Sequence, residues 1–317
     1  MIVFGPIPSR RLGRSLGINN IPPKVCSYSC VYCQLGTTGT MSIERKNFFS
    51  PDVVFDEVSQ RLELLHRTGE PIDYVTFVPD GEPTLDINLG ETLSRLNSTG
   101  VRRAVITNAS LLGIKEVRRE LSEADWVSVK IDSADERIWK RLNRPHGKLS
   151  LEAIREGVLE FSASYHGTLV TETMLVRGIN DGTASLFTTA GFISEMNPRK
   201  AYIMAPTRPP AETFVTASTE ETMNAAYQIY RSVIDDVELL THSEGVDFTF
   251  SSDAEEELLG ITAVHPMREE AVGRFLEESN SDWDLVDRLI ANNQIRRVEY
   301  LGETFFIRRA GSRVMNN

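Results

Sequence analysis

Three cysteines near the start of the chain, Cys26, Cys30 and Cys33, are the residues best suited to chemistry, and the sequence contains no others. Thiolate sulfur suits iron–sulfur clusters, zinc or copper(I). An ordinary electron-transfer cluster takes four cysteine ligands. Three thiols in a C-x3-C-x2-C spacing therefore predict a [4Fe–4S] cluster in which one iron is left open for a ligand that is not protein.

Other uses of the three thiols stay open at this point. Structural zinc normally takes a fourth Cys or His ligand, and His146 is a histidine that could fold back to the cysteine loop. Cys30 and Cys33 also form a C-x-x-C pair of the redox type, although that motif usually opens a helix and the surroundings here are rich in Pro and Gly. A disulfide framework is disfavoured by the odd number of cysteines and by the chain length of 317 residues.

The overall composition predicts a soluble globular protein, with 41% hydrophobic and 25% charged residues. No apolar run approaches the roughly 18 residues of a membrane span, so we expect no contact with a membrane. The first residues show no basic region followed by an apolar stretch, so we expect no signal peptide. With reduced thiols, these features predict a cytoplasmic protein.

The charge is distributed unevenly along the chain, whose formal net charge is −11. Residues 1–48 contain six basic side chains and one acidic side chain, which gives this segment a net charge of +5. A basic region around the cysteine loop could receive an anionic substrate or an acidic electron donor. It could equally consist of arginines that cap loops around a negatively charged cluster. We take three of its residues as candidates for substrate contact: Arg10, Arg11 and Arg14.

After the cysteine loop, apolar runs with a bias toward β-structure alternate with segments of helical periodicity. With an early strand at 1–4 or 15–18, this makes about six strand–helix repeats. Such alternation predicts an α/β fold with a parallel sheet and right-handed crossovers, and it places functional residues at the C-terminal ends of the strands. The predicted strands are 72–78, 101–107, 126–131, 168–176 and 201–204, and the predicted helices begin at Pro51 or cover 89–97, 115–122, 135–142, 151–162 and 184–196.

The alternation ends near Pro209 and Pro210, after which we expect a bridging helix at 220–235 and a bridging strand at 246–250. From residue 253 the pattern is a short acidic helix, two further helices and a hairpin. This order predicts a small winged-helix-like domain. The expected helices and hairpin strands are 268–278, 283–292, 296–300 and 304–308, and the expected parts of the chain are 1–215, 216–252 and 253–317.

The C-terminal part is acidic, with eight Arg and thirteen Asp or Glu among residues 253–317, a net charge of −5. Binding to the phosphate backbone depends on a positive surface. A structural or protein-contacting role is therefore favoured over DNA reading, although several arginines near the hairpin could make a local basic wing.

The run from Cys26 to Cys33 resembles the signature of the radical S-adenosylmethionine (SAM) superfamily. The segments 4–13 and 34–36 are similar to an uncharacterised branch of iron–sulfur oxidoreductases near the wyosine-type tRNA-modifying enzymes. The resemblance implies a partial (β/α)6 TIM-like barrel and a [4Fe–4S] cluster on the three cysteines. It also implies that SAM chelates the fourth iron, and that a low-potential donor of ferredoxin or flavodoxin type reduces the cluster.

Two strand ends resemble SAM-binding elements of that family. Asp80-Gly81-Glu82 is similar to the Gly-Gly-Glu element that holds the SAM ammonium group, with Asp80 in place of the first glycine. A glycine lets the backbone approach a ligand, and a carboxylate favours a charged amine beside it.

The resemblance also assigns residues around the SAM nucleoside. Thr107 and Asn108 resemble a strand end that contacts the ribose, with Ala109 where glycine often stands. Tyr32 occupies the aromatic position near the adenine.

Alternation along strand 126–131 places Ser128, Lys130 and Asp132 on one face. A lysine in the middle of a strand is costly to bury unless it is paired. We therefore expect Lys130 to meet the SAM carboxylate or the substrate, with Asp132 beside it. Arg177, after strand 168–176, is a candidate for binding a carboxylate or another anion. The predicted catalytic residues are Lys130, Asp132 and Arg177, and the predicted cofactor-binding residues are Tyr32, Asp80, Gly81, Glu82, Thr107, Asn108 and Lys130.

The sequence thus favours a radical SAM enzyme that cleaves SAM to a 5′-deoxyadenosyl radical, which abstracts hydrogen from a tRNA, a peptide or protein, or a metabolite. The wyosine-type enzymes carry extra cysteines for a second cluster, and this chain has none left. The alternative is an iron–sulfur, redox-sensing regulator that binds DNA through its winged helix, which the acidic C-terminal part disfavours.

Overall fold

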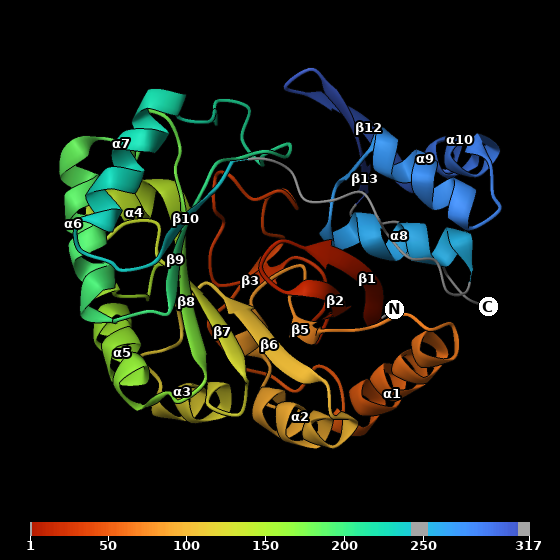
Figure 1. The fold of residues 1–317 in the computed structure, drawn as a ribbon, viewed down its shortest axis with the longest axis horizontal. Coiled ribbons are helices and arrows are strands. Elements are labelled where there is room, and N and C mark those ends of the chain that lie inside the picture. The colour runs from red at the N-terminus through yellow and green to blue at the C-terminus, as the bar shows by residue number, and fades with distance from the viewer. Residues whose placement is uncertain (1, 242–252, 310–317) are drawn as a thin grey trace.

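The computed structural model describes residues 2–241 and 253–309. Its centre is an eight-stranded sheet with the order β1-β2-β5-β6-β7-β8-β9-β10. β1 is antiparallel to β2, and the other neighbours are parallel. Figure 1 shows a curved wall with helices on its outer side. The strands are β1 (Val3–Ser9), β2 (Gly13–Ile18), β5 (Tyr74–Phe77), β6 (Arg102–Thr107), β7 (Trp126–Lys130), β8 (Thr168–Met174), β9 (Lys200–Met204) and β10 (Val237–Leu240).

Helices connect the parallel strands and bury their apolar faces against the sheet. The first begins as predicted, because the Ser50 hydroxyl accepts a hydrogen bond from the backbone N–H of Asp52 and Pro51 is its first residue. The helices are α1 (Pro51–Arg67), α2 (Leu89–Leu96), α3 (Lys115–Leu121), α4 (Glu136–Asn143), α5 (Leu151–Ser164), α6 (Thr183–Glu195) and α7 (Glu220–Arg231), with short 3-10 helices η1 (Pro83–Leu85) and η2 (Asn97–Thr99).

The predicted α/β class and partial TIM-like barrel are confirmed. An early strand was expected at 1–4 or at 15–18, and strands form at both places. They pair as the hairpin β1–β2, and β2 begins the parallel series. The series also continues past Pro209 and Pro210, because α7 leads to β10, which pairs in parallel with β9. The strand expected at 246–250 lies outside the described residues.

An apolar cluster closes the barrel on the side where the parallel strands begin. Tyr74 and Trp126 are the first residues of β5 and β7, and they pack with Leu12 from the β1–β2 turn. Side chains that alternate with the outward-facing ones fill the interior. The opposite side, where the strands end, is therefore left for polar residues. The complete cluster is Leu12, Tyr74, Ala104, Trp126, Val170, Tyr202 and Leu240.

The C-terminal part has its own hydrophobic core and a three-stranded sheet of order β11-β13-β12. The predicted helices and hairpin are present, and β11 adds a strand that the sequence pattern did not reveal. The assignment as a winged helix stays a prediction. The elements are α8 (Ala254–Val264), β11 (Met267–Arg268), α9 (Glu269–Glu278), α10 (Trp283–Ala291), β12 (Ile295–Tyr300) and β13 (Glu303–Arg308). None of the helices in the described ranges combines the length and apolar character needed to cross a membrane.

α8 lies beside β1 (Figure 1) and covers an edge strand that would otherwise offer free pairing groups. The contact includes a buried ion pair between Arg61 of α1 and Glu257 of α8, whose side chains are 13% and 1% exposed. Arg61 also donates a hydrogen bond of 2.7 Å to the carbonyl oxygen of Gly5. This arginine therefore joins the first strand, the first helix and the C-terminal part.

We predict that Arg61→Met lowers the free energy of unfolding by about 3 kcal/mol, because the substitution leaves the buried carboxylate of Glu257 without this cation. Arg67→Met is the matched control in the same helix, since Arg67 pairs with Glu63 and both are exposed. It should change stability by less than about 0.5 kcal/mol. Urea denaturation of both variants measures the difference, and equal losses would contradict the role given to Arg61.

Candidate functional site: the cysteine loop at the strand ends

The cysteine loop is held on one side by the end of β5. The backbone N–H of Lys24 donates to the carbonyl oxygen of Asp80 at 2.7 Å, and the N–H of Glu82 donates to the carbonyl oxygen of Val25 at 3.2 Å. Residues Val25–Cys26 form the short strand β3, which pairs with β4 (Thr40–Met41). The predicted SAM-binding segment 80–82 is thus hydrogen-bonded directly to the loop that carries the first cysteine.

On its other side the loop is held by the C-terminal end of α4. The backbone N–H of Ser29 donates to the carbonyl oxygen of Asn143 at 3.0 Å, and that of Val31 donates to the carbonyl oxygen of Leu142 at 2.9 Å. The last carbonyl groups of a helix have no partner within the helix. The loop supplies those partners, so the position of Cys30 depends on where α4 ends.

The three thiols are half-buried and none forms a disulfide. Burial raises the pKa of all three, and for Cys30 burial and the Asp132 carboxylate raise the pKa to about 12. Bare thiolates are therefore unfavourable here, whereas thiolates bound to cationic iron would be neutralised locally. The donor set and its surroundings fit a cluster.

Within residues 2–241 and 253–309, no three His, Cys, Asp or Glu side chains converge as they would around one metal ion. A tetrahedral zinc site requires such convergence. In a [4Fe–4S] cluster each cysteine binds a different iron, so the sulfurs need not meet at one point. The arrangement of the loop is compatible with a [4Fe–4S] cluster.

Gly81 is required by the close approach of two backbone segments. A Cβ atom at this position would lie 1.9 Å from the carbonyl oxygen of Val25. Asp80, which precedes it, turns its carboxylate to Lys24, with 3.2 Å between Nζ and Oδ1. Burial raises the pKa of Asp80, and Lys24 opposes this effect.

The Glu82 carboxylate joins the ends of β5 and β6. Its Oε1 accepts hydrogen bonds of 2.6 Å from the hydroxyls of Thr84 and Thr107, and its Oε2 accepts one of 2.8 Å from the backbone N–H of Asn108. Burial raises the pKa of Glu82, and these donors act against the rise. Both oxygens are engaged by the protein itself, so Glu82 shapes the site rather than presenting a free carboxylate.

Asn108 faces the cysteine loop. Its amide nitrogen lies 2.9 Å from the Ser27 hydroxyl and 3.6 Å from the Cys26 sulfur. The next residue, Ala109, has a φ of 64°, in the left-handed region that favours glycine. This conformation lets the chain turn back so that Asn108 reaches the loop.

Lys130 points into the barrel, where its ionic partner within the protein is Glu172. Its Nζ lies 3.6 Å from Oε2 of Glu172 on β8 and 5.4 Å from the centre of the Tyr32 ring. Ser128 donates to Oε1 of Glu172 at 2.6 Å, and Arg11 forms an ion pair with the same oxygen. Burial raises the pKa of Glu172, but Arg11, Lys130 and Ser128 together hold it below its usual range.

Asp132 lies just beyond the end of β7, which is Lys130, and its carboxylate joins a buried network. Its Oδ1 accepts from the backbone N–H of Met174 at 2.8 Å, and its Oδ2 accepts from Asn143 Nδ2 at 2.7 Å and from the Tyr32 hydroxyl. Asp132 and Lys130 line one pocket together with Asn108, and the catalytic role of Asp132 stays a prediction.

Arg177 lies on the loop after β8 and is exposed. Its backbone N–H donates to the carbonyl oxygen of Thr216 at 3.0 Å. Within the described residues, its side chain makes no hydrogen bond or ion pair with Lys130, Asp132 or the cysteine loop. The three N-terminal arginines also separate: Arg10 is exposed, Arg11 is in the barrel interior, and Arg14 pairs with Glu70.

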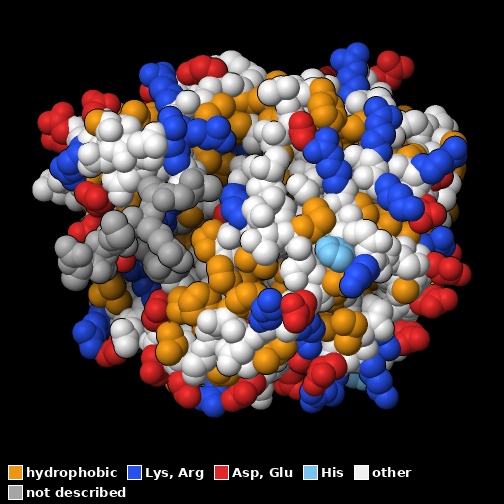
Figure 2. All heavy atoms as spheres, turned by 180° about the vertical axis from the view of Figure 1, so that it is seen from behind, with side chains coloured by type: hydrophobic (Ala, Val, Ile, Leu, Met, Phe, Trp, Pro, Cys, Tyr) orange, Lys and Arg blue, Asp and Glu red, His pale blue; other side chains and the backbone are white. Residues whose placement is uncertain are grey.

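The basic N-terminal segment is largely neutralised inside the protein. Lys24, Arg11 and Arg45 pair with Asp80, Glu172 and Glu120. Figure 2 shows basic and acidic side chains mixed over the rear face, with Lys and Arg more frequent in its upper half. The interpretation in which these residues brace the loop therefore describes most of them.

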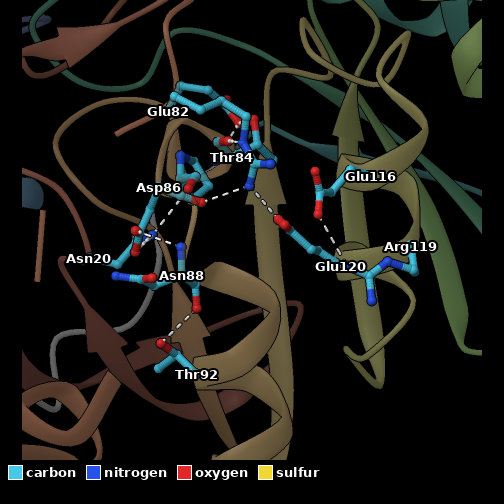
Figure 3. Close-up of polar contacts among 11 residues, drawn as sticks. Asn20, Glu82, Thr84, Asp86, Asn88, Thr92, Glu116, Arg119 and Glu120 are labelled. Carbon is cyan, nitrogen blue, oxygen red and sulfur yellow. Dashed lines mark hydrogen bonds and ion pairs between the residues drawn. The ribbon is translucent and has the colours of Figure 1, made fainter. Parts of the chain in front are cut away.

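Sequence reasoning missed a polar network that supports the segment after Glu82 (Figure 3). Asp86 accepts hydrogen bonds from Asn20 Nδ2 at 3.2 Å and from the backbone N–H of Asn88 at 3.0 Å. Arg45 donates to the Asp86 carbonyl oxygen at 2.9 Å. Burial raises the pKa of Asp86 to about 6. No local pattern reveals the network, since its members come from separate loops.

We predict that Gly81→Ala lowers the free energy of unfolding by about 3 kcal/mol and reduces the iron that the protein retains, because the added methyl group forces the Val25 carbonyl away. Gly147→Ala is the control, since a Cβ there meets nothing within 4 Å. It should stay within about 0.5 kcal/mol of wild type. Denaturation curves and iron analysis test both, and a stable Gly81→Ala protein with full iron would contradict the prediction.

The raised pKa of Asp86 predicts that the stability of the protein depends on pH. Its pKa rises from an ordinary 3.8 to about 6 in the folded protein, so the folded state binds more protons than the unfolded state in this interval. Stability should therefore be lost as pH rises from about 4 to 6, by about 3 kcal/mol for this group. Asp86→Asn should remove this loss, as measured by urea denaturation at pH 4 to 7. An unchanged pH slope in the variant would show that Asp86 is not its source.

Comparison with known proteins places the chain in a family. Residues 20–187 match the model of the radical SAM superfamily. A UPF0026 protein of Methanocaldococcus jannaschii is 44% identical over 317 residues, which cover 99% of this chain and 98% of the relative. A UPF0026 protein of Helicobacter pylori is 35% identical over 213 residues, 66% of this chain and 67% of the relative.

Among solved structures, a radical SAM methyltransferase from Sphaerobacter thermophilus shares the fold, with a TM-score of 0.54 and 14% identity over 72% of this chain and 66% of that one. The family match covers the cysteine loop and the two segments that hold it, the end of β5 and the end of α4. UPF0026 proteins are among its sequence relatives, and the chain belongs to the radical SAM superfamily.

Proposed function

We propose that this protein is a radical SAM enzyme that holds a [4Fe–4S] cluster on Cys26, Cys30 and Cys33. The observation that supports it most is the seating of the cysteine loop between the end of β5 and the end of α4, in a chain of this superfamily. The three thiols lie where parallel strands end, which is the usual place for active sites in such barrels.

A [4Fe–4S] cluster held by Cys26, Cys30 and Cys33 would supply one electron for the reductive cleavage of SAM to methionine and a 5′-deoxyadenosyl radical, which would take a hydrogen atom from the substrate. The chain's own residues would bind and orient SAM and the substrate, and they would exclude water. Gly81 allows the backbone of segment 80–82 to lie against the loop, where it can meet the SAM ammonium group. Thr107 and Asn108 shape the next strand end on the side of the ribose.

Lys130 is our candidate for binding the SAM carboxylate or an anionic group of the substrate. Its side chain is 24% exposed and its Nζ is 3.6 Å from Glu172, so the ammonium group can still donate to a ligand. The Tyr32 ring lies beside it. Arg177, on the exposed loop at the same end of the barrel, is a candidate for a more distant contact with substrate.

An apolar cluster beside Cys30 would keep water from the reacting groups. Its members come from the cysteine loop, from α4 and from the strand ends, so the cluster forms only in the folded protein. Exclusion of water protects a reactive radical from unwanted hydrogen donors. The cluster consists of Val31, Tyr32, Leu142, Met174, Val176 and Val215.

The substrate in this proposal is a tRNA, a peptide or protein, or a metabolite. A low-potential donor of ferredoxin or flavodoxin type would provide the electron. We place the protein in the cytoplasm, because free thiols persist in a reducing compartment.

The test is anaerobic reconstitution with iron and sulfide, followed by SAM and dithionite. We expect 5′-deoxyadenosine and methionine to form in the wild-type protein and to be lost in Cys30→Ala, with release measured by liquid chromatography. Gly147→Ala, which changes no described contact of the loop, should keep the activity. A wild-type protein that carries the cluster but releases no 5′-deoxyadenosine would contradict the enzyme, and an operator fragment shifted by such a protein would support a regulator instead.

A further inference from the structure

The side-chain amide of Asn143 lies against a cysteine sulfur. Asn143 is the last residue of α4 and is buried. Its Nδ2 is 3.4 Å from the Cys30 sulfur and 2.7 Å from Oδ2 of Asp132. A carboxylate only accepts hydrogen bonds, so the amide must turn its nitrogen toward Asp132. One of its two N–H bonds then serves Asp132, and the other faces the Cys30 sulfur and the Tyr32 hydroxyl oxygen, each at 3.4 Å.

The orientation of this amide is fixed from several sides. Asp132 is held by the backbone N–H of Met174 at 2.8 Å and by the Tyr32 hydroxyl. The Asp132 carbonyl oxygen also accepts from Asn180 Nδ2 at 2.9 Å. The backbone carbonyl of Asn143 itself accepts from the N–H of Ser29 in the cysteine loop at 3.0 Å. Rotation of the amide would break its hydrogen bond to Asp132, and these other contacts hold Asp132 and the Asn143 backbone in place.

Side-chain amides lie against two of the three cysteine sulfurs, Asn108 against Cys26 at 3.6 Å and Asn143 against Cys30 at 3.4 Å. The sulfurs of Cys26 and Cys33 also take backbone hydrogen bonds from Tyr28 and Leu35. The donor to Cys30 is the Asn143 side chain, because the one O–H of the neighbouring Tyr32 is donated to Asp132. A backbone donor remains after most substitutions, whereas the amide of Asn143 can be removed. Substitution of this one side chain can therefore change the surroundings of Cys30.

The two nearest polar groups act on Cys30 in opposite directions. The Asp132 carboxylate places negative charge near the sulfur, which disfavours a further electron on anything bound there. The N–H of Asn143 lies between that charge and the sulfur and presents the positive end of its dipole. Hydrogen bonds to ligand sulfurs raise the reduction potential of iron–sulfur centres. The asparagine therefore makes reduction easier than it would be beside Asp132 alone.

We propose that Asn143 is a positioning residue that orients Cys30 and raises the reduction potential of the cluster through an N–H to sulfur hydrogen bond. The proposal rests on the proposed function, since it requires the cluster on the three cysteines. It adds a residue that lies outside the cysteine motif and outside both SAM-like strand ends. Its practical consequence is that the electron donor needs a less negative potential than it otherwise would.

The experiment is a redox titration of the anaerobically reconstituted cluster, followed by electron paramagnetic resonance without SAM. Asn143→Leu removes the donor and keeps a similar volume, and we expect a more negative midpoint potential than in wild type. Asn143→Gln retains an amide and should lie closer to wild type. Asn97→Leu is the control, because Asn97 is exposed after α2 at the opposite end of the barrel, and its potential should not move.

Asn143→Ser keeps the test valid if the leucine variant does not fold. Its single O–H should bind the charged acceptor Asp132 in preference to the sulfur, so its potential should also fall. An iron-loaded Asn143→Leu or Asn143→Ser protein with the wild-type midpoint would overturn the proposal. A wild-type protein without a cluster would refute the proposed function instead, so the two failures are distinguishable.

Discussion

The docking of one irregular loop onto two regular elements is the constraint on which the rest of this structure depends. A loop of backbone groups cannot be buried unless its N–H and C=O groups find partners. Here the partners are the segment 80–82 after β5 and the free carbonyls at the end of α4. The first contact holds the chain just before Cys26, and the second holds the residues on either side of Cys30.

The same contacts explain why residues that look like ligand-binding groups turn out to be braces. Glu82 receives hydrogen bonds from Thr84, Thr107 and the backbone of Asn108. This carboxylate locks two adjacent strand ends together. Asp132 has a comparable position two strands away. A buried charge must be satisfied somewhere, and in both cases the protein supplies hydrogen-bond donors from within.

The barrel interior carries its own ionic contact. Arg11 reaches Glu172 from the β1–β2 turn, and Lys130 reaches the same carboxylate from β7. Beneath them lies the apolar cluster that closes the barrel. Lys130 is thereby held near the strand ends instead of extending into solvent. The C-terminal part contributes from outside, since Gln34, the residue after Cys33, donates to the Val264 carbonyl oxygen at 3.2 Å.

The sequence by itself determined the metal-ligand candidates and the order of strands and helices, because ligand spacing and hydrophobic periodicity are local properties of the chain. Alternation along its strand indicated Lys130, and the resemblance to a family element indicated Gly81. Only the tertiary structure decided the partners. Asn143 meets Cys30 across 113 positions, and Arg11 meets Glu172 across 161. Such pairs depend on which strands become neighbours and on how far each one extends, and no local pattern contains that information.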